Sequence, residues 1–470
     1  MRSEDIVRLL ENGGDVMMSK IITKEIKDHQ DLATELKKNY DKYAGKVPIL
    51  NRPYVDKAKI SVNKKLANDF RGDIVDQING FVLGESISVM YPDDNGQKLI
   101  TDFNSLNSID ALNTELGEYM LSCGQAGRLL YVEAGTGEVR AVNLKPWEVI
   151  YIFNASGDRI DYALIYYAYT IVNTDTGKET KTIKVEWYDK ENVTYFIKQG
   201  GSYVKEKGEV YENSELKEIV NPQPHFFDGV PIVKFIPNSR EQTAFAKVEQ
   251  LIDGYDEGLS DWLNEVIEFR NAYLKATGAE IDEDERKKAR RTGIFNLPDK
   301  DCDVDFITKT LNPEYVENLL QIIDNNIYKF SKTVNMTSEK FVAGGAESGE
   351  SRKWRMLTFV FLGIVIERYF TKCLKEQYRL VISVLNRGVK KINYLDITYE
   401  FTRKLPVDLL YSAKVVTELW GKLPKKIIYS LLPFIDNPQD VVDQLEEEEN
   451  EIDLDKIELL KQKFDQQKNE

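Results

Sequence analysis

Apolar residues recur every three or four positions through residues 243–276, which is the spacing of one stripe along an α-helix. Leu251 belongs to this stripe, and acidic residues such as Glu257 occupy the positions between. Thr243 is expected to cap the helix and Gly278 to end it. A helix of about 34 residues is roughly 50 Å long, more than a compact domain usually needs. The pattern therefore predicts a structural element such as a spacer or the wall of an assembly.

Two further amphipathic stretches follow this one. Residues 312–336 repeat the pattern and begin with Pro313 near the first helical position, where proline is favoured. Residues 352–388 form the third stretch, of about 40 residues, and end with Arg387 and Gly388. A basic last turn followed by glycine is typical of a helix C-terminus. We expect three long helices in this part of the chain.

The pattern changes to short strands between residues 127 and 237, with turn signals such as Gly200-Gly201 between them. Examples of the expected strands are residues 128–133, 137–142, 160–170 and 182–187. Helices are expected within residues 19–83 around an extended connector at 47–55, at 104–122 and within 409–445, with a short strand unit at 392–401. Because helices and strands occupy separate blocks, the predicted fold class is α+β and not alternating βαβ.

Charge and composition narrow the classes of function. The 470 residues carry a formal charge of −15, which disfavours tight nucleic-acid binding because affinity for phosphate grows with Lys and Arg contacts. Three scattered cysteines predict a reducing compartment without a disulfide framework or zinc site. No secretory signal is expected at the start of the chain. The longest apolar run, residues 357–366, is about half of what a bilayer needs, so we expect no membrane contact.

No residue pattern predicts catalysis. His29 and His225 lie in different blocks without a surrounding motif. Residues 344–351 have the spacing of a phosphate-binding loop, but Glu350 stands where the lysine must be and a helix precedes the loop. We therefore expect no catalytic site, no cofactor and no metal ion. The small residues of this segment instead predict a flexible loop with Lys340, Phe341 and Val342 at its entrance.

Residues 282–293 place acids first, bases last and then a glycine. This order is what a short helix matched to its own dipole requires. The basic members are Lys287, Lys288, Arg290 and Arg291. The alternative is that this basic cluster contacts a partner or DNA.

These elements in this order resemble the portal (head-to-tail connector) proteins of tailed bacteriophages, of the type found in phages of Gram-positive bacteria. The segments that carry the resemblance are 63–70, 74–76, 83–84, 127–131, 137–140, 146–149, 251–255, 260–261, 272–274, 348–349 and 431–436, with Tyr151 and Arg355. Each segment alone could belong to a core or a helix cap. Their order and spacing over nearly the whole chain make the resemblance specific.

The resemblance implies a ring of identical subunits, typically a dodecamer, around a channel for double-stranded DNA that is passed without sequence specificity. It implies a portal-like fold with these parts: a wing at 1–242, a first stem helix at 243–276, a clip at 277–311, a second stem helix at 312–336, a tunnel loop at 337–351, a long bridging helix at 352–388, wing return strands at 389–406, a crown at 407–445 and an acidic tail at 446–470. The tunnel loop would bring Lys340, Phe341, Val342, Gly344, Gly345 and Gly349 to the channel. The clip would bring its four basic residues to the terminase.

The implied partners are the terminase large subunit, the major capsid and scaffolding proteins, and a head-completion (adaptor) protein. The implied location is the portal vertex of the virion capsid, after assembly in the cytoplasm of the bacterial host. Two alternatives stay open: another coiled-coil-rich structural or scaffold protein of a virion, and a packaging ATPase. The strand-rich block argues against the first, and the missing phosphate-loop lysine argues against the second.

Overall fold

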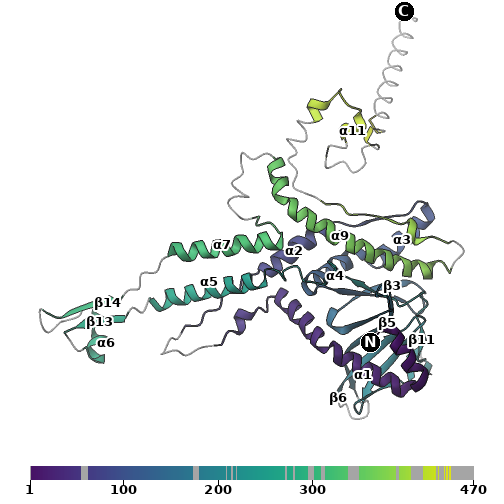
Figure 1. Ribbon diagram of the computed structural model, residues 1–470, viewed down its shortest axis with the longest axis horizontal. Helices are drawn as coiled ribbons and strands as arrows, with labels where there is room; N and C mark the ends of the chain where they lie inside the picture. Colours follow the sequence, from purple (N-terminus) through teal and green to yellow (C-terminus); the bar gives the residue numbers. More distant parts are fainter. Residues whose placement is uncertain are drawn as a thin grey trace, which may run out of the picture. The chain divides into compact units, whose positions relative to one another are not determined.

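The computed structural model divides the chain into two compact units (Figure 1). The first unit comprises Met1–Asn335 with Thr358–Thr402, and the second comprises Met336–Leu357 with Arg403–Glu470. The structure describes residues 2–53, 62–172, 179–207, 209–212, 215–218, 220–269, 273–278, 281–294, 301–307, 313–336, 349–387, 391–403, 416–429, 432, 439, 441–442 and 444–445. Both units are described below only over these residues.

Four helices and one helical turn precede the strand-rich block. They are α1 (Ser3–Tyr43), η1 (Pro48–Asn51), α2 (Phe70–Leu83), α3 (Asp94–Leu106) and α4 (Ile109–Cys123). Asp69 caps α2 by accepting a hydrogen bond of 3.1 Å from the N–H of Gly72. The single helix expected at 104–122 is wrong, because Ser108 adopts φ +48° and separates α3 from α4.

Two antiparallel sheets form the strand-rich block. Their strands are β2 (Ala126–Val132), β3 (Val139–Leu144), β4 (Val149–Phe153), β5 (Ile160–Val172), β6 (Glu179–Tyr188), β7 (Asn192–Gln199), β8 (Ser202–Lys205), β11 (Gln223–Pro224) and β12 (Ile232–Phe235). The six-stranded sheet has the order β11-β7-β6-β5-β4 with β8 also on β7, and the three-stranded sheet has the order β12-β2-β3. The four strands named in the prediction are confirmed as β2, β3, β5 and β6. The fold is α+β.

Two further short strand pairs lie outside these two sheets. Strands β9 (Glu209–Glu212) and β10 (Glu215–Glu218) form a hairpin. Strand β15 (Thr398–Glu400), after the turn η3 (Tyr394–Asp396), pairs with β1 (Ser88–Met90), with Tyr399 opposite Val89. The strand predicted within 392–401 is therefore present. It pairs with residues 88–90, about 300 positions earlier in the chain.

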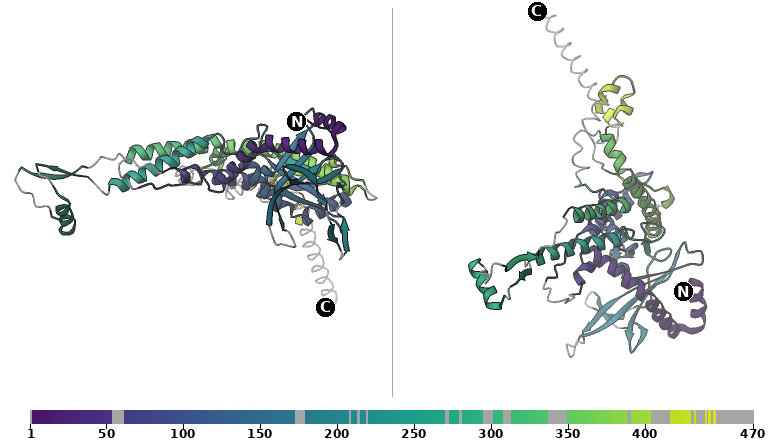
Figure 2. Two further views of the ribbon diagram at one scale, coloured as in Figure 1. Left: turned by 90° about the horizontal axis from the view of Figure 1, so that it is seen from below. Right: turned by 60° about the vertical axis from the view of Figure 1, so that its left-hand side comes forward.

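One hydrophobic core of the first unit lies between α1 and one face of the six-stranded sheet. Ile6, Ile21 and Ile22 of α1 pack with Ile150, Ile152, Leu164, Val185, Trp187, Phe196 and Tyr203 of the strands. Figure 2 shows α1 lying along the sheet. The other face of this sheet is buried as well, because Val149, Ala163, Ile165, Tyr188 and Val193 pack with Leu129 and Ile232 of the three-stranded sheet.

The first long helix is shorter than predicted. Helix α5 covers Glu249–Phe269 and has 21 residues, not about 34. Residues 244–248 form turns, so Thr243 does not cap a helix. Beyond the helix, the chain forms β13 (Tyr273–Thr277), which pairs antiparallel with β14 (Asp303–Ile307). Gly278 follows a strand with φ +75°, so its predicted role as a helix end is also wrong.

The other two helices lie where they were predicted, although α7 ends at Ser331 and not at residue 336, because Lys332 adopts φ +65°. Helix α7 covers Pro313–Ser331 and begins at the expected proline. Helix α9 covers Gly349–Leu385 and has 37 residues. Of the second unit the structure describes a helical turn at 416–419 and α11 (Lys425–Tyr429), where the rings of Trp420 and Tyr429 lie 5.9 Å apart.

Candidate partner-binding and channel elements

A small strand and helix unit is inserted in the chain between α5 and α7. Strand β13 begins at Tyr273, shortly after α5 ends, and β14 ends at Ile307, shortly before α7 begins. Between the two strands lies α6 (Glu283–Thr292). Asp282 caps α6 by accepting a hydrogen bond of 2.7 Å from the N–H of Glu285, and the N–H of Gly293 closes its other end at 2.8 Å from the Ala289 carbonyl. The predicted short helix with acids first and bases last is confirmed.

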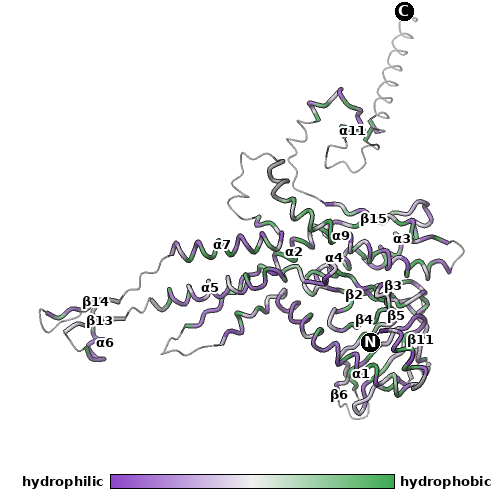
Figure 3. The backbone as a smooth tube through the Cα atoms, in the orientation of Figure 1, coloured by the Kyte–Doolittle hydropathy of each residue, from purple (hydrophilic) through white to green (hydrophobic). Residues whose placement is uncertain are grey.

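The basic residues of α6 are presented to solvent. Figure 3 shows α6 as largely hydrophilic, and Lys287, Lys288 and Arg291 are exposed. Lys287 lies 3.3 Å from Glu283, one turn earlier. Arg290 is part of the helix, but its side chain lies outside the described residues. The structure therefore places the four predicted residues on one helix, with the side chains of Lys287, Lys288 and Arg291 exposed.

Helices α5 and α7 lie side by side (Figure 1). Leu320 and Ile327 of α7 are buried, and a Cβ on Gly258 of α5 would lie 3.7 Å from Leu320. Tyr328 of α7 donates a hydrogen bond of 2.9 Å to Asp73 of α2. The helical pair is thus attached to the rest of the first unit by both apolar and polar contacts.

A polar row on α5 binds the backbone of residues 62–69, and sequence reasoning missed it. The side chains of Asp256, Ser260 and Asn264 accept hydrogen bonds of 3.0, 2.9 and 2.7 Å from the N–H groups of Asn68, Leu66 and Lys64. Four residues of helix rise about 6 Å, close to the roughly 6.6 Å spanned by two residues of extended chain, so the two spacings match. The sequence contains a signal for this contact, because Asp256, Ser260 and Asn264 are short polar residues spaced four apart on a predicted helix.

Two arginines strengthen this attachment. Arg52 lies 2.6 Å from Asp261, on the exposed side of α5. Arg71 of α2 is almost fully buried and donates to Asp253 at 2.7 Å, with its guanidinium 5.9 Å from the centre of the Phe245 ring. A buried cation needs such a partner, because its removal from water is otherwise costly.

A second buried arginine joins the small sheet to α4 and α9. Arg128 of β2 is fully buried and donates to Asn143, Asn113 and Gln377 at 3.0, 3.0 and 2.8 Å. Burial lowers the pKa of Arg128 to about 10, so it stays protonated at neutral pH. Its hydrogen bonds therefore hold α4 and β3 together with α9, which lies far from both in the sequence.

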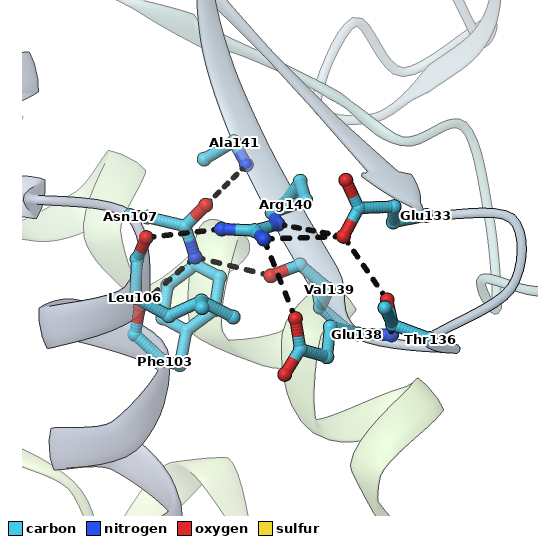
Figure 4. Close-up of polar contacts among 9 residues, drawn as sticks. All are labelled: Phe103, Leu106, Asn107, Glu133, Thr136, Glu138, Val139, Arg140 and Ala141. Atoms are coloured by element: carbon cyan, nitrogen blue, oxygen red, sulfur yellow. Dashed lines mark hydrogen bonds and ion pairs between the residues drawn. The ribbon is translucent and has the colours of Figure 1, made fainter.

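The 137–140 segment of the family resemblance has a structural role, shown in Figure 4. Arg140 of β3 donates to the Leu106 carbonyl at 3.1 Å and lies 3.1 and 3.4 Å from Glu133 and Glu138. Asn107 donates to the carbonyls of Phe103 and Val139 and accepts from the N–H of Ala141, at 2.9, 3.0 and 2.8 Å. These contacts fix the end of α3 against the β2–β3 hairpin.

The predicted tunnel loop falls mostly outside the described residues. This applies to Lys340, Phe341, Val342, Gly344 and Gly345. Gly349 is the first residue of α9. The placement of this loop in a channel stays a prediction.

The described residues hold neither a metal-ligand cluster nor a membrane-spanning helix. In that part of the chain, no group of three or more His, Cys, Asp or Glu side chains is placed to hold a metal ion. Over the same residues, no helix has the length and apolar character that a bilayer span requires.

The comparisons with known proteins agree on one family. Residues 22–454 match the family described as phage portal protein, SPP1 Gp6-like. The chain is 24% identical to the portal protein of Bacillus phage SPP1 over 406 residues, which is 83% of this chain and 77% of that protein. It is 25% identical to the portal protein of Clostridium phage phiCD119 over 240 residues, which is 50% of this chain and spans about half, 51%, of that relative. Because the match covers most of the sequence, this chain belongs to the SPP1 Gp6-like family of phage portal proteins.

Proposed function

We propose that copies of this chain close into a ring, typically of twelve, whose central channel passes double-stranded DNA through one vertex of a phage capsid. The ring would serve genome packaging, retention and ejection. It would also dock the terminase large subunit and later the head-completion protein, and it would contact the major capsid and scaffolding proteins. In this proposal α5 and α7 form the stem, residues 277–311 the clip and residues 337–351 the tunnel loop.

The observation that carries the proposal is a second apolar face on α7. Leu319, Ile322 and Phe330 are 44%, 57% and 48% exposed. Leu319 and Ile322 each lie one residue before a position of the α5-facing stripe, so they point about 100° around the helix from it. A helix with two apolar faces about a quarter turn apart can pack on a neighbour at each face.

A second copy of the same chain is the partner that fits this face. Side-by-side packing around a closed ring uses two different faces of every subunit, one for each neighbour. Fully burying a Leu, Ile or Phe side chain stabilises an interface by roughly 1.5–3 kcal/mol, before the costs of association. Repeated around a ring, this contribution favours closure over an open array.

The test measures assembly directly. Negative-stain electron microscopy and native mass spectrometry of the purified full chain should give hollow rings. The double variant Leu319→Lys with Ile322→Lys should shift the protein to single chains or dimers, because two buried lysines would face the neighbour. The matched control, Gln321→Lys with Asn325→Lys, adds the same charge on exposed positions of α7 away from both faces and should leave rings intact.

The charge of the chain supports passage without tight binding. Each copy carries a formal charge of −15, so a ring of such copies attracts phosphate only weakly. Lys340 and its neighbours in the loop are proposed to approach the DNA backbone without base contacts. Deleting residues 344–349 should leave ring assembly unchanged and impair DNA packaging or retention. Normal packaging by that deletion variant, in a complementation assay with infectious particles as readout, would reject the role of the loop.

The clip assignment has its own support. Lys287, Lys288 and Arg291 are exposed on a helix whose caps are complete, so their charge is available to an acidic surface on a partner. We assign this contact to the terminase large subunit during packaging.

A further inference from the structure

A groove in the first unit lies between α1 and the ends of three strands. It has a volume of about 850 Å³ and is lined by residues of α1, β5, β7 and β8. Four exposed apolar side chains line it: Val16, Tyr169, Ile171 and Val204. Val16 is 70% exposed, which is unusual for a valine in a helix that packs on a sheet. Clusters of exposed apolar residues mark interaction surfaces more often than isolated ones do.

The walls of this α1–β8 groove are fixed by specific contacts. Gly14 adopts φ +51° and ψ −144° and breaks the helical path of α1 just before the groove. Ser19 then accepts a hydrogen bond of 2.8 Å from the N–H of Tyr203, and Asp15 lies 2.9 Å from Lys205. Both contacts join α1 to β8. The position of α1 beside β8 is therefore fixed by contacts that do not use the four exposed apolar side chains of the groove.

A row of lysines continues from the groove along α1. Lys20, Lys24 and Lys27 are exposed and spaced four and three residues apart, which places them on one helix face. They line a smaller hollow of about 360 Å³ that shares Ser19, Lys20 and Ser202 with the groove. Among the described residues, none of these three lysines forms an ion pair within 4 Å. In a chain of net charge −15, these three lysines outnumber Asp28, the acid that lines the same hollow.

We propose that the groove and the lysine row together bind an acidic peptide segment of a partner protein, one that also carries apolar side chains. Its carboxylates would pair with Lys20, Lys24 and Lys27, and its apolar side chains would fill the groove beside Val16 and Val204. Charge complementarity selects an acidic partner. The apolar groove selects a peptide over a nucleic acid, because a duplex presents phosphates and sugars to a protein surface and has no apolar side chains to insert.

The first test uses a defined probe on the full chain. The probe is a fluorescent 15-residue peptide in which Glu and Asp alternate with Leu and Ile, and its counterpart replaces every acid by Gln or Asn. Fluorescence anisotropy at moderate salt should show at least tenfold tighter binding of the acidic peptide. Raising the salt concentration should weaken that binding, because the lysine row is exposed.

Variants locate the site. The triple variant Lys20→Glu, Lys24→Glu and Lys27→Glu should weaken the acidic peptide at least tenfold. The matched control, Lys38→Glu, Lys98→Glu and Lys190→Glu, makes the same change of net charge at exposed lysines outside the groove and should stay within twofold of the parent chain. Val16→Ser with Val204→Thr should weaken binding about fivefold without adding charge. Should the glutamate variant fail to fold by circular dichroism, Lys→Gln at the same three positions replaces it.

Three results would overturn the proposal. The first is no preference for the acidic peptide over its neutral counterpart. The second is equal weakening by the lysine-row variant and its control, which would mean that only net charge matters. The third is binding of a 20-base-pair duplex that depends on the lysine row while the peptide does not bind, which would make this a nucleic-acid surface. The test needs no ring and no DNA passage, so its outcome is independent of the proposed channel function.

Discussion

Asp256 of α5 accepts two hydrogen bonds from Asn68, at 3.0 Å from the backbone N–H and 2.7 Å from the side-chain amide. With Ser260 and Asn264 it holds residues 62–69 against the helix. These side chains of α5 accept hydrogen bonds from backbone N–H groups of the extended segment. In a sheet, the carbonyl groups of a neighbouring strand would accept such bonds. The consequence is that the attachment of α5 to the N-terminal part of the chain depends on few, specific side chains.

Removing Asp256 should cost more than removing an exposed acid of the same helix. Asp256→Ala leaves two donors of Asn68 without their acceptor, so we expect a loss of about 2–3 kcal/mol in the free energy of unfolding. Asp261→Ala breaks only the ion pair with Arg52, whose acid is 70% exposed, and should cost about 0.5 kcal/mol or less. Chemical denaturation of the full chain measures both. Equal losses for the two variants would contradict the role given to Asp256.

The same residue should affect the pH dependence of stability. Burial raises the pKa of Asp256 above its ordinary value of 3.8, although the hydrogen bonds from Asn68 and the charge of Arg71 oppose the shift. The folded protein therefore binds this proton more tightly than the unfolded chain, and ionisation of Asp256 destabilises the fold. As pH rises from 3.8 through the raised pKa, the parent chain should lose stability relative to Asp256→Asn. Denaturation of both proteins across this window, with parallel curves as the contrary result, provides the measurement.

His29 should make the protein less stable in acid. Its Nδ1 atom shares a hydrogen bond of 2.9 Å with the Tyr166 hydroxyl, and burial lowers the pKa of His29 from 6.5 to about 4. The unfolded chain therefore takes up a proton first, and stability is lost as pH falls from 6.5 towards 4. The loss is expected to be on the order of 2 kcal/mol between pH 7 and 4.5.

The variant His29→Gln removes the titrating group and should flatten this part of the stability curve. His225→Gln is the control for the other histidine, whose pKa burial also lowers. An unchanged slope in the His29 variant would show that another group titrates in this range.

Asn107 should be the main connection between α3 and the β2–β3 hairpin in Figure 4. Asn107→Ala removes three hydrogen bonds to backbone groups of two elements, and we expect a loss of about 2–3 kcal/mol. Asn95→Ala, at an exposed position in the same helix, should stay within about 0.5 kcal/mol of the parent. Thermal and chemical denaturation distinguish the two, and a similar small effect of both would mean that Arg140 alone secures the hairpin.

Neutralising the basic residues of α6 should affect partner binding and not assembly. The change of Lys287, Lys288, Arg290 and Arg291 to Gln should weaken binding of the purified terminase large subunit at least tenfold while rings still form. The control neutralises the acids of the same helix, Glu283→Gln, Asp284→Asn and Glu285→Gln, and keeps the cap at Asp282. Surface plasmon resonance on immobilised rings measures both. A stronger loss of binding in the acid variants would contradict this prediction, because the partner surface would then be basic.

The sequence alone determined the elements whose signals are local. Helix α7 begins at its proline, α6 has its acids, bases and terminal glycine in order, and β5 and β6 lie where strands were predicted. Caps, dipole matches and periodicity act over a few residues, so they can be read from a short stretch of chain. The family could be recognised for a related reason, since the order of such segments was preserved along most of the chain.

The tertiary structure decided what depends on distant residues. Tyr273 and Leu274 continue the apolar period of α5, yet they form a strand, because β14 supplies its hydrogen-bonding partner about thirty residues later. Asp256 and Arg128 belong to residue types that are usually exposed, and their burial follows from acceptors or donors on other elements. A local pattern indicates which secondary structure and which exposure a segment favours. Contacts with distant residues decide which of these the folded chain adopts.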